Sequence, residues 1–163
     1  MAVVMSPARV GSGKVPSIIY GRYDSADAIV QGSVLVLAAG EYNLAGADPA
    51  LLAGIALQDK DTAPGYAAAN NPVPITGREQ KISIAEINSV TVFQATLTNG
   101  SAVRIAPVQA DVGAQYGITA YNGVWTIDKA KTAADARVIV VGIDLERNMV
   151  FFRVLADHIA GAA

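Results

Sequence analysis

The chain has 163 residues, of which 52% are hydrophobic and only 16% are charged, and its formal net charge is −2. The apolar fraction excludes a disordered chain, which needs low hydrophobicity and high net charge, and no run approaches the ~18 uncharged apolar residues of a membrane-spanning helix. The balanced charge gives no general basic surface for nucleic acid, so neither nucleic acid nor a membrane is an expected partner.

The hydrophobic residues are mainly those that favour strands. The sequence contains 19 Val, 14 Ile and 8 Thr but only 9 Leu, and side chains branched at Cβ fit a pleated strand better than a helix. No cysteine is present, which excludes disulfides and thiolate metal sites. This composition predicts an all-β protein.

Residues 1–17 are predicted to form an extended N-terminal arm. Proline and glycine interrupt each apolar run in this segment, so no regular element fits it. Residues 1–22 carry three cations and no acid, whereas residues 23–61 have a net charge of −5. An arm of this kind is expected to dock on a neighbouring subunit or on another protein, through Val3, Val4, Met5, Pro7, Arg9 and Val10.

Short apolar runs separated by turn residues begin at Ile18. Residues 33–38 (SVLVLA) are apolar after the first serine, as in a strand that is buried on both faces, and residues 54–57 form a second such run. Between them, residues 48–52 are predicted to form a single helical turn with an aspartate cap and a proline at the first position. Residues 73–76 are predicted to be a short edge strand, because their proline cannot donate a ladder hydrogen bond.

The second half of the chain shows clearer strand patterns. Residues 81–87 alternate polar and apolar side chains with period two, which is typical of a half-buried strand. Asn-Gly dipeptides are signals for type I′ turns. Paired strands are therefore predicted at 93–97 with 102–105 around Asn99-Gly100, and at 116–120 with 124–127 around Asn122-Gly123. A final hairpin is predicted from the two strand-like runs 137–143 and 149–155, which flank residues 146–148.

These patterns amount to eight to ten short strands with turns every ~8–12 residues, which is typical of a sandwich or a barrel. The absence of a long amphipathic segment argues against a helical layer. We therefore expect a single compact all-β domain, a barrel or a sandwich, over residues 18–163, preceded by the arm over residues 1–17.

Residues with a clear chemical role are few. The one histidine, His158, is not accompanied by a nucleophile-elbow motif, and residues 11–14 (GSGK) lack the first Gly and the Ser or Thr of a phosphate-binding loop. Two close carboxylate pairs are candidates for metal or acid–base chemistry, although solvated turn acids are the simpler interpretation: Asp24 with Asp27, and Asp59 with Asp61. We expect a protein that is not an enzyme and that uses no cofactor.

Several segments, taken in order, resemble the head decoration (capsid cement) proteins of tailed bacteriophages. The likeness covers most of residues 32–155 and consists of strand and turn patterns rather than chemical motifs. The segments are 32–36 (GSVLV), 52–59 (LAGIALQD), 72–77 (PVPITG), 112–118 (VGAQYGI), 123–128 (GVWTID) and 138–144 (VIVVGID).

The resemblance implies a tulip-like β-barrel, a homotrimer, and a place on the outer capsid surface of the virion after synthesis in the host cytoplasm. It also implies that the protein bridges subunits of the major capsid protein and stabilises the head. The alternative is a trimeric β-barrel module that binds a small ligand or a carbohydrate around Trp125 and the neighbouring tyrosines. A hydrolase that uses one of the two carboxylate pairs is a third, weaker hypothesis.

Overall fold

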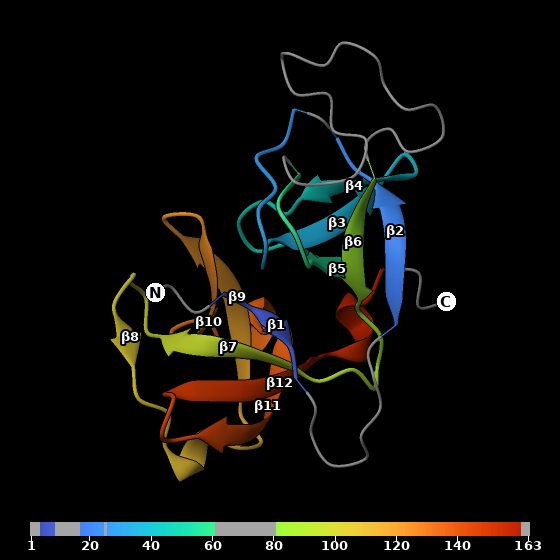
Figure 1. The fold of residues 1–163 in the computed structure, drawn as a ribbon. Coiled ribbons are helices and arrows are strands. Elements are labelled where there is room, and N and C mark those ends of the chain that lie inside the picture. The colour runs from blue at the N-terminus through green and yellow to red at the C-terminus, as the bar shows by residue number, and fades with distance from the viewer. Residues whose placement is uncertain (1–3, 9–16, 25, 61–80, 161–163) are drawn as a thin grey trace.

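The computed structural model describes residues 4–8, 17–24, 26–60 and 81–160 (Figure 1). The all-β prediction is confirmed, since these residues form two β-sheets and, apart from short 3-10 turns, no helix. They contain twelve strands against the eight to ten predicted. Two of the twelve, β1 (Ser6–Pro7) and β8 (Arg104–Ile105), have only two residues each, which is too short to leave a period-two pattern in the sequence.

The larger sheet closes on itself. Its strand order is β1-β7-β10-β9-β11-β12, and β12 also pairs with β7, so five strands form a ring while β1 and β8 are added along β7. The sheet therefore has the character of a small barrel. Its other strands are β7 (Phe93–Thr98), β9 (Gln115–Tyr121), β10 (Val124–Asp128), β11 (Val138–Asp144) and β12 (Met149–Val154).

The smaller sheet has the order β2-β6-β5-β3-β4 and lies beside the larger one (Figure 1). Tyr23, directly after β2, forms a parallel bridge with Tyr42 of β4, and the Asp24 amide donates to the Tyr42 carbonyl at 3.1 Å. The two outer strands of this sheet are thereby brought together. The strands are β2 (Ile18–Arg22), β3 (Val34–Ala38), β4 (Glu41–Leu44), β5 (Gly54–Ala56) and β6 (Lys81–Glu86).

The predicted strand pairing is confirmed for β9–β10, β11–β12 and β7–β8. Asn122 and Gly123 both have positive φ, 52° and 78°, and they join the paired residues Tyr121 and Val124 as a type I′ turn requires. The type I′ prediction at Asn99-Gly100 is wrong. Only the glycine has positive φ there, because the connection from Thr98 to Arg104 is a five-residue loop.

One apolar core extends across both sheets. It combines Phe93, Trp125 and Phe152 of the larger sheet with Val34 and Ile55 of the smaller one, each 5% exposed or less. A second, smaller core, with Leu35, Ile82 and Ile84 among its residues, belongs to the smaller sheet alone. The period-two pattern predicted for residues 81–87 is visible here, since Ile82 and Ile84 are fully buried and Ser83 is not.

Polar contacts also join the two sheets through the loop between β4 and β5. The buried guanidinium of Arg137 donates to the carbonyl oxygens of Pro49 at 2.8 Å and of Ala134 at 2.9 Å. His158 Nδ1 lies 2.8 Å from the Ala50 carbonyl oxygen, and Lys131 forms a salt bridge with Asp48. Three 3-10 turns lie between or after the strands of the larger sheet: η2 (Gln109–Asp111), η3 (Ala133–Asp135) and η4 (Ala156–His158).

The helical turn predicted over residues 48–52 does not form. Asp48 has φ +51°, a left-handed conformation that a helix cap does not adopt. Its carboxylate is engaged instead by Lys131, which lies just before η3 of the larger sheet. The edge strand predicted at 73–76 lies outside the described residues.

Candidate functional site

The N-terminal segment over residues 4–8 contacts its own chain. Met5 is 1% exposed and belongs to the core shared by the two sheets. Ser6 and Pro7 pair with Gln94 and Phe93 of β7, and Gln94 Nε2 donates to Ser6 Oγ at 2.9 Å. The buried Met5 side chain is therefore available to a neighbouring protein only if this segment leaves its position on β7.

The other residues predicted to form the docking arm divide between two situations. Val4 and Pro7 are half-buried and remain partly accessible. Val3, Arg9 and Val10 lie outside the described residues. The predicted contact of this arm with a neighbour stays a prediction. The expectation that no regular element fits residues 1–17 is wrong for Ser6–Pro7, which form β1 on the edge of β7.

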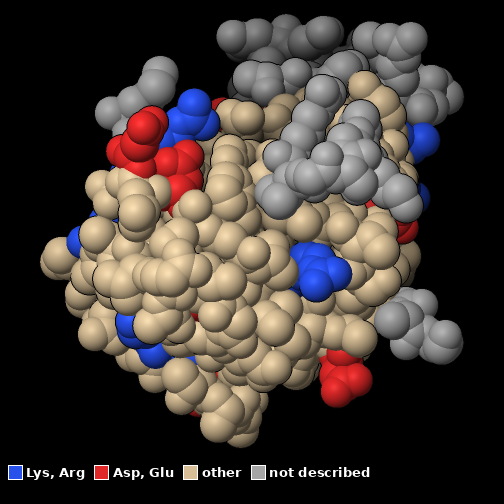
Figure 2. Space-filling view, turned by 90° about the horizontal axis from the view of Figure 1, so that it is seen from below, with Lys and Arg blue, Asp and Glu red and all other residues tan. Residues whose placement is uncertain are grey.

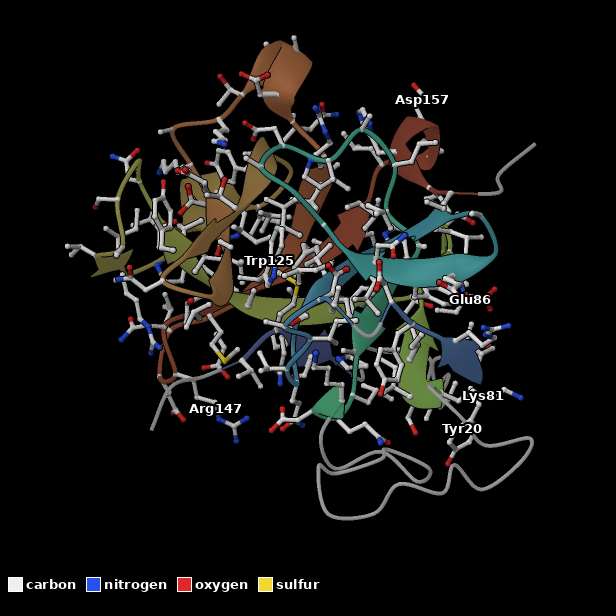
Figure 3. The ribbon with its side chains drawn as sticks, turned by 90° about the horizontal axis from the view of Figure 1, so that it is seen from above. Tyr20, Lys81, Glu86, Trp125, Arg147 and Asp157 are labelled. Atoms are coloured by element: carbon white, nitrogen blue, oxygen red, sulfur yellow. The ribbon has the colours of Figure 1, made fainter. Side chains whose placement is uncertain are left out.

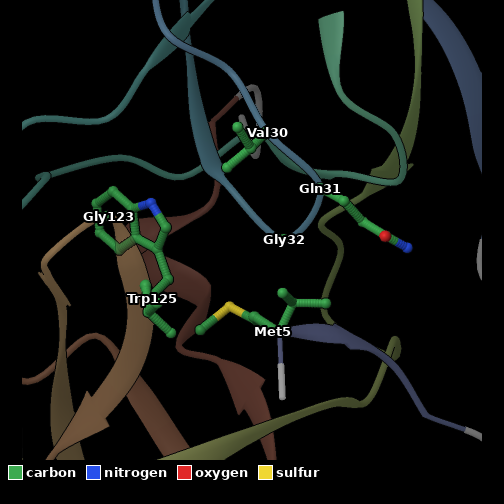
Figure 4. A pocket seen from close by; sticks show the side chains of 8 residues that line it. Met5, Val30, Gln31, Gly32, Gly123 and Trp125 are labelled. Carbon is green, nitrogen blue, oxygen red and sulfur yellow. The ribbon is translucent and has the colours of Figure 1, made fainter. Parts of the chain in front are cut away.

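A cavity of about 90 Å³ lies beside Trp125, between the N-terminal segment and the β9–β10 turn (Figure 4). Trp125 itself is only 5% exposed, so its ring presents no open face on which a sugar could stack. The lining side chains are mainly apolar: Val4, Met5, Val30, Gln31, Gly32, Gly123, Val124 and Trp125. A cavity of this size and lining suits a single small apolar group.

Asp111 is the centre of a buried polar cluster that the sequence patterns do not indicate. The residue is 1% exposed, and its Oδ1 accepts from Tyr116 Oη at 2.7 Å and from Lys129 Nζ at 2.6 Å. The Val108 amide donates to Oδ2 at 2.8 Å. Burial alone raises the pKa of Asp111, but the hydrogen bonds and the Lys129 charge outweigh it and hold the pKa below 3.8.

Asp128 forms a second cluster of the same kind and is fully buried. The amides of Gly100 and Ala130 donate to its Oδ1 at 2.8 and 3.0 Å, and Tyr121 Oη donates to Oδ2 at 2.7 Å. Burial raises the pKa of Asp128, and these hydrogen bonds lower it by more. The Gly100 amide belongs to the β7–β8 loop, and the Val108 amide directly precedes η2. The two buried carboxylates therefore hold this loop and η2 in place.

The two carboxylate pairs predicted from the sequence also bond to backbone amides. Asp24 Oδ1 accepts from the Ala26 amide at 2.8 Å, and Asp27 Oδ2 accepts from the Leu44 amide. Asp59 Oδ1 accepts from the Gln31 amide at 2.7 Å, and its predicted partner Asp61 lies outside the described residues. Each described carboxylate therefore stabilises a turn or a strand edge.

The described ranges contain no group of three or more His, Asp or Glu side chains placed to hold a metal ion. Within the same ranges, no helix has the length and apolar character needed to cross a bilayer.

Exposed apolar side chains lie on the smaller sheet and in loops. Tyr20, Val90, Val103 and Leu145 are each more than 60% exposed. In the view from below, toward β11 and β12, uncharged residues, polar as well as apolar, cover most of the visible face (Figure 2). The periodicity of the sequence does not identify these residues, since Tyr20 continues an apolar run and Leu145 stands alone between two acids.

The fold thus defines an all-β protein of two sheets with a barrel-like form. Comparison with known proteins adds no relative to this description. No family model matches the chain, and no curated protein and no solved structure matches it either.

Proposed function

We propose that this chain is a structural virion protein that binds the outer surface of a phage capsid, bridges subunits of the major capsid protein and stabilises the head as a homotrimer. The proposal begins from the six segments that, in their order along the chain, resemble phage decoration proteins. Five of those six segments lie in the described residues, and they contribute to β3, β5, β9, β10 and β11. The resemblance therefore falls on strands of both sheets rather than on loops.

The observation that carries the proposal is the exposure of large apolar side chains. They lie on the smaller sheet and in several loops, among them Tyr20, Val103 and Leu145. A protein that binds a capsid lattice needs contact area rather than a pocket, because many modest contacts repeated over the lattice add up to firm attachment. The low charged fraction of 16% agrees with surface that becomes covered.

Binding to phage heads tests the proposal directly. Purified protein is mixed with expanded, undecorated heads, and the heads are sedimented to separate bound from free protein. We expect saturable binding and a higher temperature of head disruption. No binding at saturating concentration, or binding that leaves head stability unchanged, would contradict the proposed function.

A ligand-binding module is the second candidate, and the cavity beside Trp125 is the observation that favours it. Its apolar lining fits a small apolar ligand and offers few of the hydrogen-bonding groups that a carbohydrate needs. Since the chain has a single tryptophan, its fluorescence reports on this site alone. A saturable shift in emission on addition of benzene or toluene would support this function, and an unchanged spectrum would contradict it.

A further inference from the structure

The outer face of β2 combines exposed apolar residues with two cations. Ile18 and Tyr20 are 53% and 67% exposed, and they alternate along β2 with buried or half-buried residues, as side chains on one face of a strand do. Arg22 continues the same face, and Lys81 of β6 stands directly opposite Arg22 in the antiparallel register. We call these four residues, Ile18, Tyr20, Arg22 and Lys81, the β2 face.

Among the residues that the structure describes, the charge on the β2 face is only partly balanced. Like charges directly opposite each other on neighbouring strands are unfavourable. Arg22 Nη2 is paired with Glu41 Oε1 at 3.0 Å, whereas Lys81 has no ion-pair partner among the described residues. The face therefore presents an excess positive charge beside exposed apolar area, and a partner for it needs an acid next to an apolar side chain.

The turn between β11 and β12, residues 145–148, has that complementary chemistry together with Asp144 directly before it. Leu145 is 64% exposed and stands between Asp144 and Glu146. Asp144 Oδ1 accepts from the amides of Glu146 and Arg147, both at 3.0 Å, which fixes the shape of the turn. Arg147 Nε lies 3.9 Å from Asp144 Oδ2, and Glu146 has no ion-pair partner in the part of the chain that the structure describes.

The β2 face and the β11–β12 turn lie on opposite sides of the molecule. Figure 3 labels Tyr20 and Lys81 together on one side, and Arg147 on the other. One chain therefore cannot bring its own turn onto its own β2 face, whereas a second copy can. A contact between two different patches of identical chains is heterologous, and it closes into a ring when the rotation between copies allows closure.

We propose that the β11–β12 turn of one copy docks on the β2 face of the next copy. Leu145 packs against Ile18 and Tyr20, and Glu146 pairs with Lys81. A second copy of the chain fits the β2 face because the two patches are complementary. Each patch has exposed apolar area and, among the described residues, the unpaired charge of Lys81 on one is opposite to that of Glu146 on the other. The inference rests on the homotrimer part of the proposed function and deepens it, since it names the strands that join the subunits.

Sedimentation velocity of the full chain, without phage heads, tests the docking of the apolar residues. We expect the wild-type chain to associate, and Leu145→Ser or Tyr20→Ser to weaken association by roughly tenfold or more, because each removes a large apolar side chain from the contact. Val103→Ser is the matched control, since Val103 is 68% exposed and lies on neither patch. A monomeric wild-type chain, or equal weakening by all three substitutions, overturns the proposal.

Exchanging the charges of Lys81 and Glu146 tests whether these two residues pair across the contact. Neither has an ion-pair partner among the described residues. Lys81→Glu and Glu146→Lys are each expected to weaken association, and the double variant Lys81→Glu with Glu146→Lys is expected to restore it. Failure of the double variant to restore association overturns the proposed pairing. Unchanged Trp125 fluorescence in each variant shows that the fold is intact.

Cysteine cross-linking gives an independent readout, because the chain has no cysteine of its own. In the double variant Lys81→Cys with Glu146→Cys, oxidation is expected to link successive copies and to produce a closed, reducible oligomer, while each single variant stays unlinked. No cross-link in the associated double variant overturns the proposal. These measurements use no phage heads. A result against the docking therefore does not contradict capsid binding, and a failure to bind heads does not contradict the docking.

Discussion

Gly32 and Val4 approach each other so closely that a β-carbon on Gly32 would stand 2.8 Å from the Val4 Cβ atom. Gly32 lies in the loop before β3 of the smaller sheet, and its amide donates to the Ala56 carbonyl at 2.8 Å. Val4 begins the segment that runs along β7 of the larger sheet. The N-terminal segment therefore fits against both sheets, and the glycine makes room for it.

Substitution Gly32→Ala is expected to destabilise the fold by about 2 kcal/mol or more. The φ angle of +84° is strained for any residue with a β-carbon, and the new methyl group would also displace Val4. Gly40→Ala is the matched control, because Gly40 has φ +82° and a β-carbon there would meet no atom within 4 Å. Urea unfolding of both variants separates the two effects. Equal losses would show that Val4 does not press on Gly32.

Met5→Ala is expected to destabilise the chain by roughly 2–5 kcal/mol, the usual cost of truncating a large buried side chain. Met5 is 1% exposed in the core that joins the two sheets. Met5→Leu keeps most of the volume and is expected to cost less than about 1.5 kcal/mol. Urea unfolding followed by Trp125 fluorescence measures both. A loss of less than about 0.5 kcal/mol in Met5→Ala would mean that the segment is detached in solution.

Local patterns predict the elements whose signal lies in a few adjacent side chains. The alternation over residues 81–87 and the turn at Asn122-Gly123 each depend on a few adjacent side chains, and both predictions hold. The strand Glu41–Leu44 is missed by the sequence patterns, because all four of its residues are half-buried and show no alternation. It pairs with β3 through the two-residue turn Ala39-Gly40, in which both residues have positive φ, and an alanine at such a position is not a turn signal.

The candidate sites are harder to predict because their partners lie far apart in the chain. Met5 is buried by residues from both sheets, and its neighbour Ser6 pairs with Gln94, 88 residues away. Asp111 resembles an ordinary loop acid in the sequence, and only the fold brings Lys129 to it. Leu145 does carry a local signal for a contact surface, because it is a lone apolar side chain between two acids in a tight turn.

Acid is expected to weaken the larger sheet through Asp111 and Asp128. Both carboxylates have pKa values below their ordinary 3.8 in the fold, so in the unfolded chain they bind protons more readily. Their contribution to stability is full well above pH 3.8 and is lost as the pH falls through the folded pKa values. The free energy of unfolding, measured by urea titration at a series of pH values, is expected to fall steeply below pH 3.8.

The variant Asp111→Asn measures how much of the loss of stability at low pH is due to Asp111. The variant is expected to lose about 1–3 kcal/mol near neutral pH, because the amide leaves buried donors poorly matched. It is also expected to show a shallower fall in stability at low pH than the wild-type chain. Asp144→Asn, at the end of β11, serves as the control. An acid dependence that stays equally steep in Asp111→Asn would contradict the assignment.

Alkaline conditions are expected to destabilise the chain through Tyr116 and Tyr121. Burial and the bond to Asp111 raise the pKa of Tyr116 to about 12, and the bond to Asp128, with burial, raises the pKa of Tyr121 to about 12. An unfolded tyrosine ionises near a pH of about 10, so this contribution is full below about pH 10 and is lost as the pH rises through about 12. Tyrosinate absorbance against pH should show Tyr116 and Tyr121 titrating near a pH of about 12, and this part of the titration should disappear in the variant Tyr116→Phe with Tyr121→Phe. If all six tyrosines titrate near a pH of about 10 while the chain is still folded, the two hydrogen bonds do not persist in solution.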